Sequence, residues 1–194
     1  MTDKKPYHHG DLRSALLVAA EAELADRGVE AFSLRAVAKR AGVSHAAPAH
    51  HFGDANGLLT ALAAVGFREF LAAQTARERK AAPDARSQLL ASGVGYVDFA
   101  VERPTLFRLI FGSNRTNHTN PELADAAGKA YGHLVGLVHT AGGRTLADEA
   151  AIWALAHGLA DLLVSGRLAT ITSFDPPQRD AMIEEILQRV LPPA

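Results

Sequence analysis

Apolar residues recur at helical spacing along most of the chain. In the segment from about Asp11 to Arg27, for example, Leu16, Ala20 and Leu24 fall on one side of a helix. Ala and Leu are abundant, β-branched runs are short and aromatic residues make up only 6% of the chain, which favours an all-α fold. Further helices are predicted at about 34–41, 45–52, 55–80, 84–103, 105–111, 121–140, 146–168 and 176–191.

The clearest local signals lie between residues 33 and 52. Ser33 is a hydroxyl N-cap for the second predicted helix, and Gly42 supplies the left-handed backbone that ends it. Ser44 is the expected cap of the next helix, whose first turn tolerates Pro48 because the early N–H groups have no partner within the helix. Two short helices around a tight turn predict a helix-turn-helix.

The charge of this stretch favours binding to nucleic acid. Arg35, Lys39 and Arg40 are the only formally charged side chains from residue 31 to 53, and all three are basic. The formal net charge of the whole chain is −1, but the local surface decides which partner a small basic unit attracts. The start of the second helix of such a unit can enter a major groove.

Composition excludes several classes of protein. The 194 residues have room for one large or two small domains, and 48% of them are hydrophobic, which suffices for a core. Cysteine is absent, so disulfides, thiol nucleophiles and Cys-ligated zinc are excluded. The first ten residues lack the apolar segment of a signal peptide, and no apolar run approaches the ~20 residues of a membrane span. We expect a cytoplasmic protein without a membrane partner.

The pattern Ser33-Leu-x-x-Val37-Ala38-x-x-Ala41-Gly42-Val43-Ser44, followed by His51-Phe52 and Leu58-Leu59, resembles the DNA-binding domain of the tetracycline-repressor (TetR) family. The resemblance implies a helix-turn-helix domain at 10–70, joined by a long helix to a larger helical ligand-binding and dimerisation domain at 84–194. It also implies an operator in double-stranded DNA, a small-molecule inducer and a homodimer as partners.

The resemblance also indicates which side chains face DNA. Arg35 is the residue able to bond a guanine edge with two hydrogen bonds, or else a phosphate. Ala49 and Ala55 replace the Tyr and Lys that are usual in the family, a change expected to weaken sequence-independent affinity and flatten its salt dependence. The predicted DNA-contacting residues are Ser33, Arg35, Ser44, His45, Ala46, Ala47, Pro48, His50 and His51.

In the second domain the resemblance implies an inducer cavity, although every residue assigned to it is by default a core residue. The Trp153-x-x-x-His157-Gly158 spacing resembles a motif of one TetR subgroup and specifies no ligand. A small apolar or aromatic inducer is expected. The predicted ligand-binding residues are Phe107, Ile110, Phe111, Tyr131, His133, Leu134, Trp153 and His157.

The last two predicted helices carry more apolar positions than one small domain needs, and small residues such as Gly158 permit close helix approach. We assign these helices to self-association, although burial in the chain's own core explains about half of the pattern on the usual stripe width of amphipathic helices. A two-fold dimer is favoured because two recognition helices must lie about one helical turn, ~34 Å, or a multiple apart.

An enzyme is not expected. His157 and Asp161 lie one turn apart, but no nucleophile elbow, phosphate-binding glycine loop or metal-spaced carboxylate pair accompanies them. No metal or cofactor is predicted. A ligand-responsive regulator, most simply a repressor, is the first hypothesis. The alternatives are the same fold with weak or lost DNA binding, acting through its ligand domain or a protein partner, and an esterase-like or metal enzyme.

Overall fold

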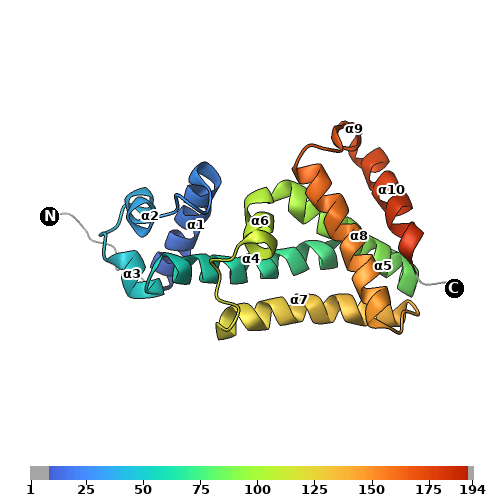
Figure 1. Ribbon diagram of the computed structural model, residues 1–194, viewed down its shortest axis with the longest axis horizontal. Helices are drawn as coiled ribbons and strands as arrows, with labels where there is room; N and C mark the ends of the chain where they lie inside the picture. The colour runs from blue at the N-terminus through green and yellow to red at the C-terminus, as the bar shows by residue number, and fades with distance from the viewer. Residues whose placement is uncertain (1–8, 192–194) are drawn as a thin grey trace.

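The computed structural model of the chain describes residues 9–191, and this part is all-α, as predicted (Figure 1). No strand occurs within residues 9–191. The elements in chain order are α1 (His9–Arg27), α2 (Leu34–Ala41), α3 (Ala47–Phe52), α4 (Ala55–Glu78), α5 (Ala85–Glu102), α6 (Pro104–Gly112), α7 (Pro121–Thr140), α8 (Leu146–Val164), α9 (Ala169–Thr172), α10 (Pro176–Leu187) and the short 3₁₀-helix η1 (Gln188–Val190).

Helix α4 organises the molecule. Its 24 residues run along the long axis, with α1 and α3 packed against its beginning and α5, α6 and α7 against the remainder (Figure 1). One continuous hydrophobic cluster reaches from Leu16 of α1 through Leu62 of α4 to Leu187 of α10. The two ends of the molecule therefore share a core, and no flexible linker separates them.

Most helix starts follow the capping signals in the sequence. The Ser33 hydroxyl accepts a hydrogen bond from the N–H of Ala36 at 3.3 Å, and Asp54 Oδ1 accepts one from the N–H of Gly57 at 2.7 Å. Gly42 ends α2 at a φ of 68°, a conformation that costs glycine little. The sequence therefore determines where the second and fourth helices begin.

Several boundaries differ from the prediction. Helix α3 begins at Ala47 without a side-chain cap, because Ser44 opens a turn in which its carbonyl accepts from the N–H of Ala47 at 3.0 Å. Helix α10 ends at Leu187, four residues earlier than expected, and the 3₁₀-helix η1 follows it. Helix α8 ends at Val164, four residues earlier than expected, and the separate turn α9 was not predicted.

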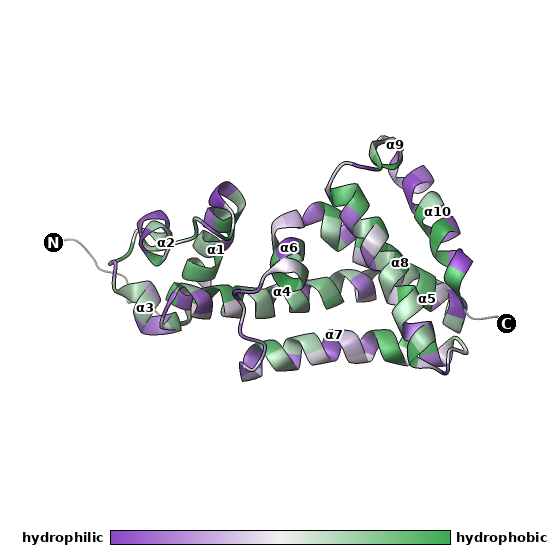
Figure 2. Cartoon of the chain, in the orientation of Figure 1, coloured by the Kyte–Doolittle hydropathy of each residue, from purple (hydrophilic) through white to green (hydrophobic). Residues whose placement is uncertain are grey.

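Helices α8 and α10 carry both hydrophobic and hydrophilic residues along their length (Figure 2), and the apolar ones are divided between the core and the surface. Ile152, Leu159 and Leu163 of α8 are buried within the chain, as are Ile183 and Leu187 of α10, so these five apolar positions belong to the core and not to the predicted self-association surface. Their burial against α5 and neighbouring helices accounts for this part of the pattern. Other apolar residues of α8, such as Leu162, remain exposed on its outward side.

Candidate nucleic-acid interface and ligand cavity

The helix-turn-helix presents most of the predicted DNA-contacting residues to solvent. The exposed ones are Ser33, Arg35, Ser44, His45, Ala46 and His50, whereas Ala47 and His51 are half-buried. Pro48 is buried and belongs to the core of this unit, so its ring is turned away from any DNA lying on the exposed face. Its position follows from the first turn of α3, where a residue without an N–H is tolerated and the ring can pack inward.

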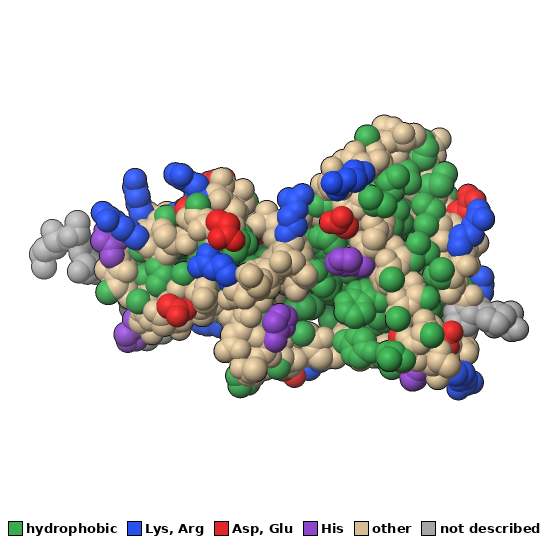
Figure 3. Space-filling view, in the orientation of Figure 1, with side chains coloured by type: hydrophobic (Ala, Val, Ile, Leu, Met, Phe, Trp, Pro, Cys, Tyr) green, Lys and Arg blue, Asp and Glu red, His purple; other side chains and the backbone are tan. Residues whose placement is uncertain are grey.

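The basic side chains of α2 differ in their freedom. Arg35 and Lys39 are exposed and have no ion pair among residues 9–191. Arg40 instead donates to Asp26 and to Glu23 of α1, at 2.5 and 3.2 Å, and these hydrogen bonds raise the pKa of the Arg40 guanidinium. Blue side chains stand over this end of the molecule in Figure 3. The free positive charge of α2 is therefore smaller than the sequence suggests.

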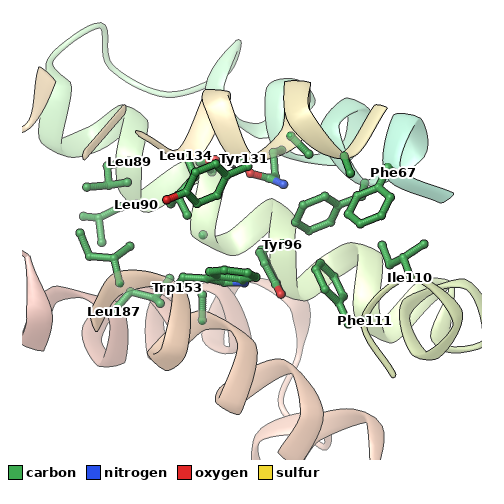
Figure 4. Close-up of a pocket in the computed structure, with 18 of the residues that line it drawn as sticks. Phe67, Leu89, Leu90, Tyr96, Ile110, Phe111, Tyr131, Leu134, Trp153 and Leu187 are labelled. Atoms are coloured by element: carbon green, nitrogen blue, oxygen red, sulfur yellow. Dashed lines mark hydrogen bonds between the residues drawn. The ribbon is translucent and has the colours of Figure 1, made fainter. Parts of the chain in front are cut away.

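A cavity of about 390 Å³ lies between α4, α5, α6, α7, α8 and the C-terminal helices. Its volume is within the range of small-molecule sites, and its walls are mainly aromatic and aliphatic. Tyr131 of α7 and Trp153 of α8 face each other across it in Figure 4, with ring centroids 6.1 Å apart. The labelled wall residues are Phe67, Leu89, Leu90, Tyr96, Ile110, Phe111, Tyr131, Leu134, Trp153 and Leu187.

Five of the eight predicted ligand-binding residues line this cavity: Ile110, Phe111, Tyr131, Leu134 and Trp153. The other three, Phe107, His133 and His157, do not. His133 lies outside it and bonds Glu78 Oε1 through Nε2 at 2.7 Å. Phe107 and His157 line a second hollow together with Val29 and Asp161. The helical turn carries these three side chains to other faces of their helices.

Tyr96 stands between the cavity and the second hollow. Its phenol oxygen lies 2.7 Å from His157 Nδ1, and the two groups share a hydrogen bond whose direction depends on the imidazole tautomer. Burial lowers the pKa of His157, against the opposing charge of Asp161, and burial raises the pKa of Tyr96. The pair is therefore a neutral hydrogen bond in the wall.

Five polar residues of the cavity were not predicted from the sequence, and two of them, Ser113 and His118, lie in the loop after α6. The other three are Gln74 on α4 and Ser92 and Tyr96 on α5, and all three are buried. The Ser92 hydroxyl donates to Gln74 Oε1 at 2.9 Å. The only signal for Gln74 is its place on the same side of α4 as Phe67 and Phe70, a helical spacing that also fits the core.

At the open side of the cavity, Glu149 of α8 forms hydrogen bonds with two side chains of α7. Tyr131 donates to Glu149 Oε2 at 2.9 Å, and His139 Nε2 lies 3.1 Å from Oε1. The hydrogen bond with Glu149 raises the pKa of the Tyr131 phenol. Tyr131 and Trp153 remain 44% and 40% exposed, so the cavity meets solvent between α7 and α8.

Helix α6 connects the cavity with the helix-turn-helix. At its start, Arg103 pairs with Glu21 of α1 through both carboxylate oxygens, at 2.7 and 2.8 Å, and with Glu69 of α4 at 2.9 Å. Beyond its end, Arg115 donates to the carbonyl of Val29 and, at 2.9 Å, to Asn56 Oδ1. The helix that carries two cavity residues is thus tied at both ends to the N-terminal unit.

A second connection runs through the start of α7. Glu122 bonds Arg13 of α1 at 2.8 Å and Arg68 of α4 at 3.0 Å. The Thr60 hydroxyl of α4 accepts from the N–H of Asn117 at 3.0 Å, which holds the preceding loop. The loop between α6 and α7 and the first turn of α7 are therefore both hydrogen-bonded to α4.

Other kinds of site find little support. Among the side chains that the structure describes, from Leu12 to Leu191, no group of three or more His, Asp or Glu is placed to hold a metal ion. No helix in that part of the chain is long and apolar enough to cross a membrane.

A helix-turn-helix at one end of a shared helix and an apolar cavity at the other define a DNA-binding regulator with a ligand domain. Residues 16–62 match the family described as bacterial regulatory proteins, tetR family, and residues 89–190 match the tetracyclin repressor-like C-terminal domain. The chain belongs to the TetR family, whose members regulate transcription by binding DNA and are not enzymes.

Solved structures agree with this assignment. A protein with unknown function from Rhodococcus sp. RHA1 is 32% identical over 97% of this chain and 100% of that chain, with a TM-score of 0.78. A TetR family transcription regulator from Marinobacter aquaeolei VT8 is 20% identical over 94% and 96%, with a TM-score of 0.71. The fatty acid degradation regulator FadR from Bacillus halodurans is 16% identical over 98% and 97%, with a TM-score of 0.68.

No curated protein matches the chain. The two relatives below 25% identity show the fold alone. Assignment to the subgroup with the Trp153-His157-Gly158 spacing stays a prediction.

Proposed function

We propose that the chain is a homodimeric repressor that leaves a palindromic operator when a small apolar or aromatic inducer enters the cavity. In this proposal residues 10–70 bind DNA and residues 84–194 bind ligand and form the dimer. A regulator of this kind acts where the DNA is, which places it in the cytoplasm.

The double role of α6 supports the ligand response. Ile110 and Phe111 of α6 line the cavity, and a Cβ at Gly66 of α4 would lie 2.8 Å from Ile110, so α6 packs tightly against α4. A ligand that displaces this wall must also move Arg103 and Arg115, which hold the N-terminal unit. A packed helix tied at both ends transmits such a movement, because cores resist continuous deformation.

The outer side of α8 supports the dimer. Ala151, Ala154 and Leu162 are exposed on this helix, and Gly158 between them has open space where a Cβ would stand. Figure 3 shows green side chains gathered over α8 and α10 on one face. Small apolar residues allow the helices of two subunits to approach closely, and a two-fold axis through them sets two copies of α3 at a fixed separation.

Operator release tests this function. Anisotropy of labelled duplexes from the DNA upstream of the gene gives the operator dissociation constant with and without candidate apolar ligands. An inducer should weaken operator binding by about 5- to 150-fold, the usual range of coupling, and operator should weaken inducer binding by the same factor. If no ligand that fills the cavity changes operator affinity, the chain is not an inducible repressor.

The small amount of free positive charge on α2 favours the alternative in which DNA binding is weak or lost. Arg40 is paired within the protein, and Ala49 and Ala55 offer no phosphate contact of the usual kind. The same fold with weak or lost DNA binding would act through its ligand domain or a protein partner. Equal, weak binding to upstream and random duplexes at low salt would support this alternative, whereas sequence-selective binding would contradict it.

A further inference from the structure

A buried amide in the cavity wall has one group without a partner. Gln74 is 4% exposed, and its Oε1 accepts from the Ser92 hydroxyl at 2.9 Å. Its Nε2 is buried and has no hydrogen-bond partner among residues 9–191. An unpaired buried donor is costly and rare in a folded protein, so it calls for a partner that the chain does not supply.

The amide cannot readily leave the cavity. The backbone of α5 approaches α4 so closely at this point that a Cβ at Gly95 would lie 2.6 Å from Gln74 Cα. The Ser92 hydroxyl holds the oxygen end of the amide from the same helix. Backbone and side chain are thus fixed together, and Nε2 is presented as a preorganised donor.

The remainder of the wall carries no formal charge. Among the described lining residues there is no Lys, Arg, Asp or Glu, and Glu149 is engaged outside the cavity by Tyr131 and His139. The one imidazole in the wall, His118, is exposed to solvent and lies 3.3 Å from Thr116 Oγ1, so it is not a buried counter-charge. An ionised ligand would lose its hydration without gaining a counter-charge, which disfavours carboxylates and ammonium ions alike. The large aromatic and aliphatic surface, in contrast, favours a hydrophobic skeleton.

We infer that the ligand of this cavity is an uncharged, mainly hydrophobic molecule with a carbonyl or similar acceptor oxygen, which accepts a hydrogen bond from Gln74 Nε2. This inference rests on the proposed function and names the chemical class of its inducer. The volume of about 390 Å³ equals that of roughly a dozen liquid waters, which leaves room for a compact ketone, ester or lactone.

The chain provides its own reporter for a test. Trp153 is the single tryptophan of the protein and lines the cavity, so its fluorescence reports occupancy without DNA. Cyclohexyl methyl ketone, ethylcyclohexane and cyclohexanecarboxylate share a ring and differ in the acceptor and the charge. We expect the carboxylate to bind at least about tenfold more weakly than the ketone, because burying its charge without a partner is unfavourable.

Gln74→Leu removes the donor while keeping the site filled. The affinity of the ketone relative to ethylcyclohexane should fall by about tenfold or more in this variant, the change expected when a neutral hydrogen bond is lost. Gln178→Leu, the same substitution at an exposed glutamine of α10 outside the cavity, is the matched control and should leave that ratio unchanged. A ratio that is equal in the wild type and Gln74→Leu would overturn the inference.

A measurement on the wild type covers the case in which Gln74→Leu fails to fold. The infrared carbonyl stretch of the bound ketone should lie lower than that of the same ketone in hexane, because hydrogen bonding weakens the C=O bond. A stretch at the hexane position, or no change of Trp153 fluorescence with any probe, contradicts the inference. Gln74-dependent ketone binding without any effect on operator affinity would contradict only the repressor function.

Discussion

Arg35 and Arg40 belong to the same short helix and are predicted to do different work. Arg35 is exposed and free of ion pairs among residues 9–191, whereas Arg40 pairs with Glu23 and Asp26 of α1. Only the first can give both its hydrogen bonds to a base edge or a phosphate.

Arg35→Ala should weaken operator binding by ~1–3 kcal/mol and relax the preference at one base pair, since it removes a bidentate donor. Arg40→Ala should not act in this way and should instead lower the thermal midpoint of unfolding, because Glu23, 5% exposed, loses its partner.

The expectation for Arg35→Ala is checked by affinities across single-base operator variants, with Arg167→Ala as a distant exposed control. An unchanged profile for Arg35→Ala would refute its role in base recognition.

The departures at Ala49 and Ala55 separate hydrogen bonding from charge. Ala49 is exposed, so Ala49→Tyr should tighten binding to all duplexes alike. Because a phenol adds no charge, the flatter salt dependence expected from the two departures together is due to Ala55 and not to Ala49. Ala55→Lys should steepen the slope of log affinity against log salt by about 0.9 for one added phosphate contact. Titrations at several salt concentrations measure both, and equal slopes for all three proteins would count against a phosphate role at position 55.

His157 gives the fold a predictable response to acid. Burial lowers its pKa below the ordinary 6.5, so the unfolded chain binds more protons than the folded one as the pH falls through that region. Stability should decrease below about pH 6.5 and less so in His157→Asn, which keeps an acceptor for Tyr96. Urea midpoints at neutral and mildly acidic pH measure the difference, and identical losses in both proteins would exclude His157 as a source.

Single residues also show what sequence reasoning can reach. Ser33, Gly42 and Asp54 were predictable because capping and helix termination depend on a few neighbouring residues. Gln74 was not, because its role depends on Ser92, a partner from another helix. Contacts between helices fix such roles, and the spacing within one helix does not contain them.

At the scale of elements, α6 is both cavity wall and domain contact. Arg103→Gln should remove its charge from between Glu21 and Glu69 and so loosen the attachment of α6 to α1. Ligand should then still change the fluorescence of Trp153, while the ratio of operator affinities with and without ligand moves toward one. Arg189→Gln, which breaks an exposed pair within the C-terminal segment, is the control. Full coupling in Arg103→Gln would show that α6 does not transmit the signal.

Apolar stripes predicted the long helices well, because a stripe of several turns is robust to one misplaced residue. The helix 121–140 agrees with α7 at both ends, helped by Pro121 in its first turn and Gly142 beyond its end. Short elements carry fewer turns and less signal, so the start of α3 and the existence of α9 escaped prediction. The rotation of a helix also decides whether Phe107 or Phe111 meets the cavity, and only packing fixes it.

At the scale of the molecule, the outer side of α8 makes the assembly testable. Gly158→Arg adds a large charged side chain where the single subunit has open space, so it should disrupt the dimer and leave the subunit folded. Sedimentation at micromolar concentration should show a monomer with unchanged helicity and much weaker operator binding. Gly136→Arg, in equally open space on α7, is the control. A dimeric Gly158→Arg protein would exclude this face as the interface.

The length of α4 has a further consequence. One uninterrupted helix contributes to the core of both units, and a single hydrophobic cluster joins them. Heating should therefore melt the whole chain in one cooperative transition, without a stage in which only one unit is unfolded. Occupation of the cavity should then slow amide exchange and protease cleavage in α1 and α2. The ligand raises the free energy of unfolding of the whole cooperative unit, so it protects helices with which it has no contact.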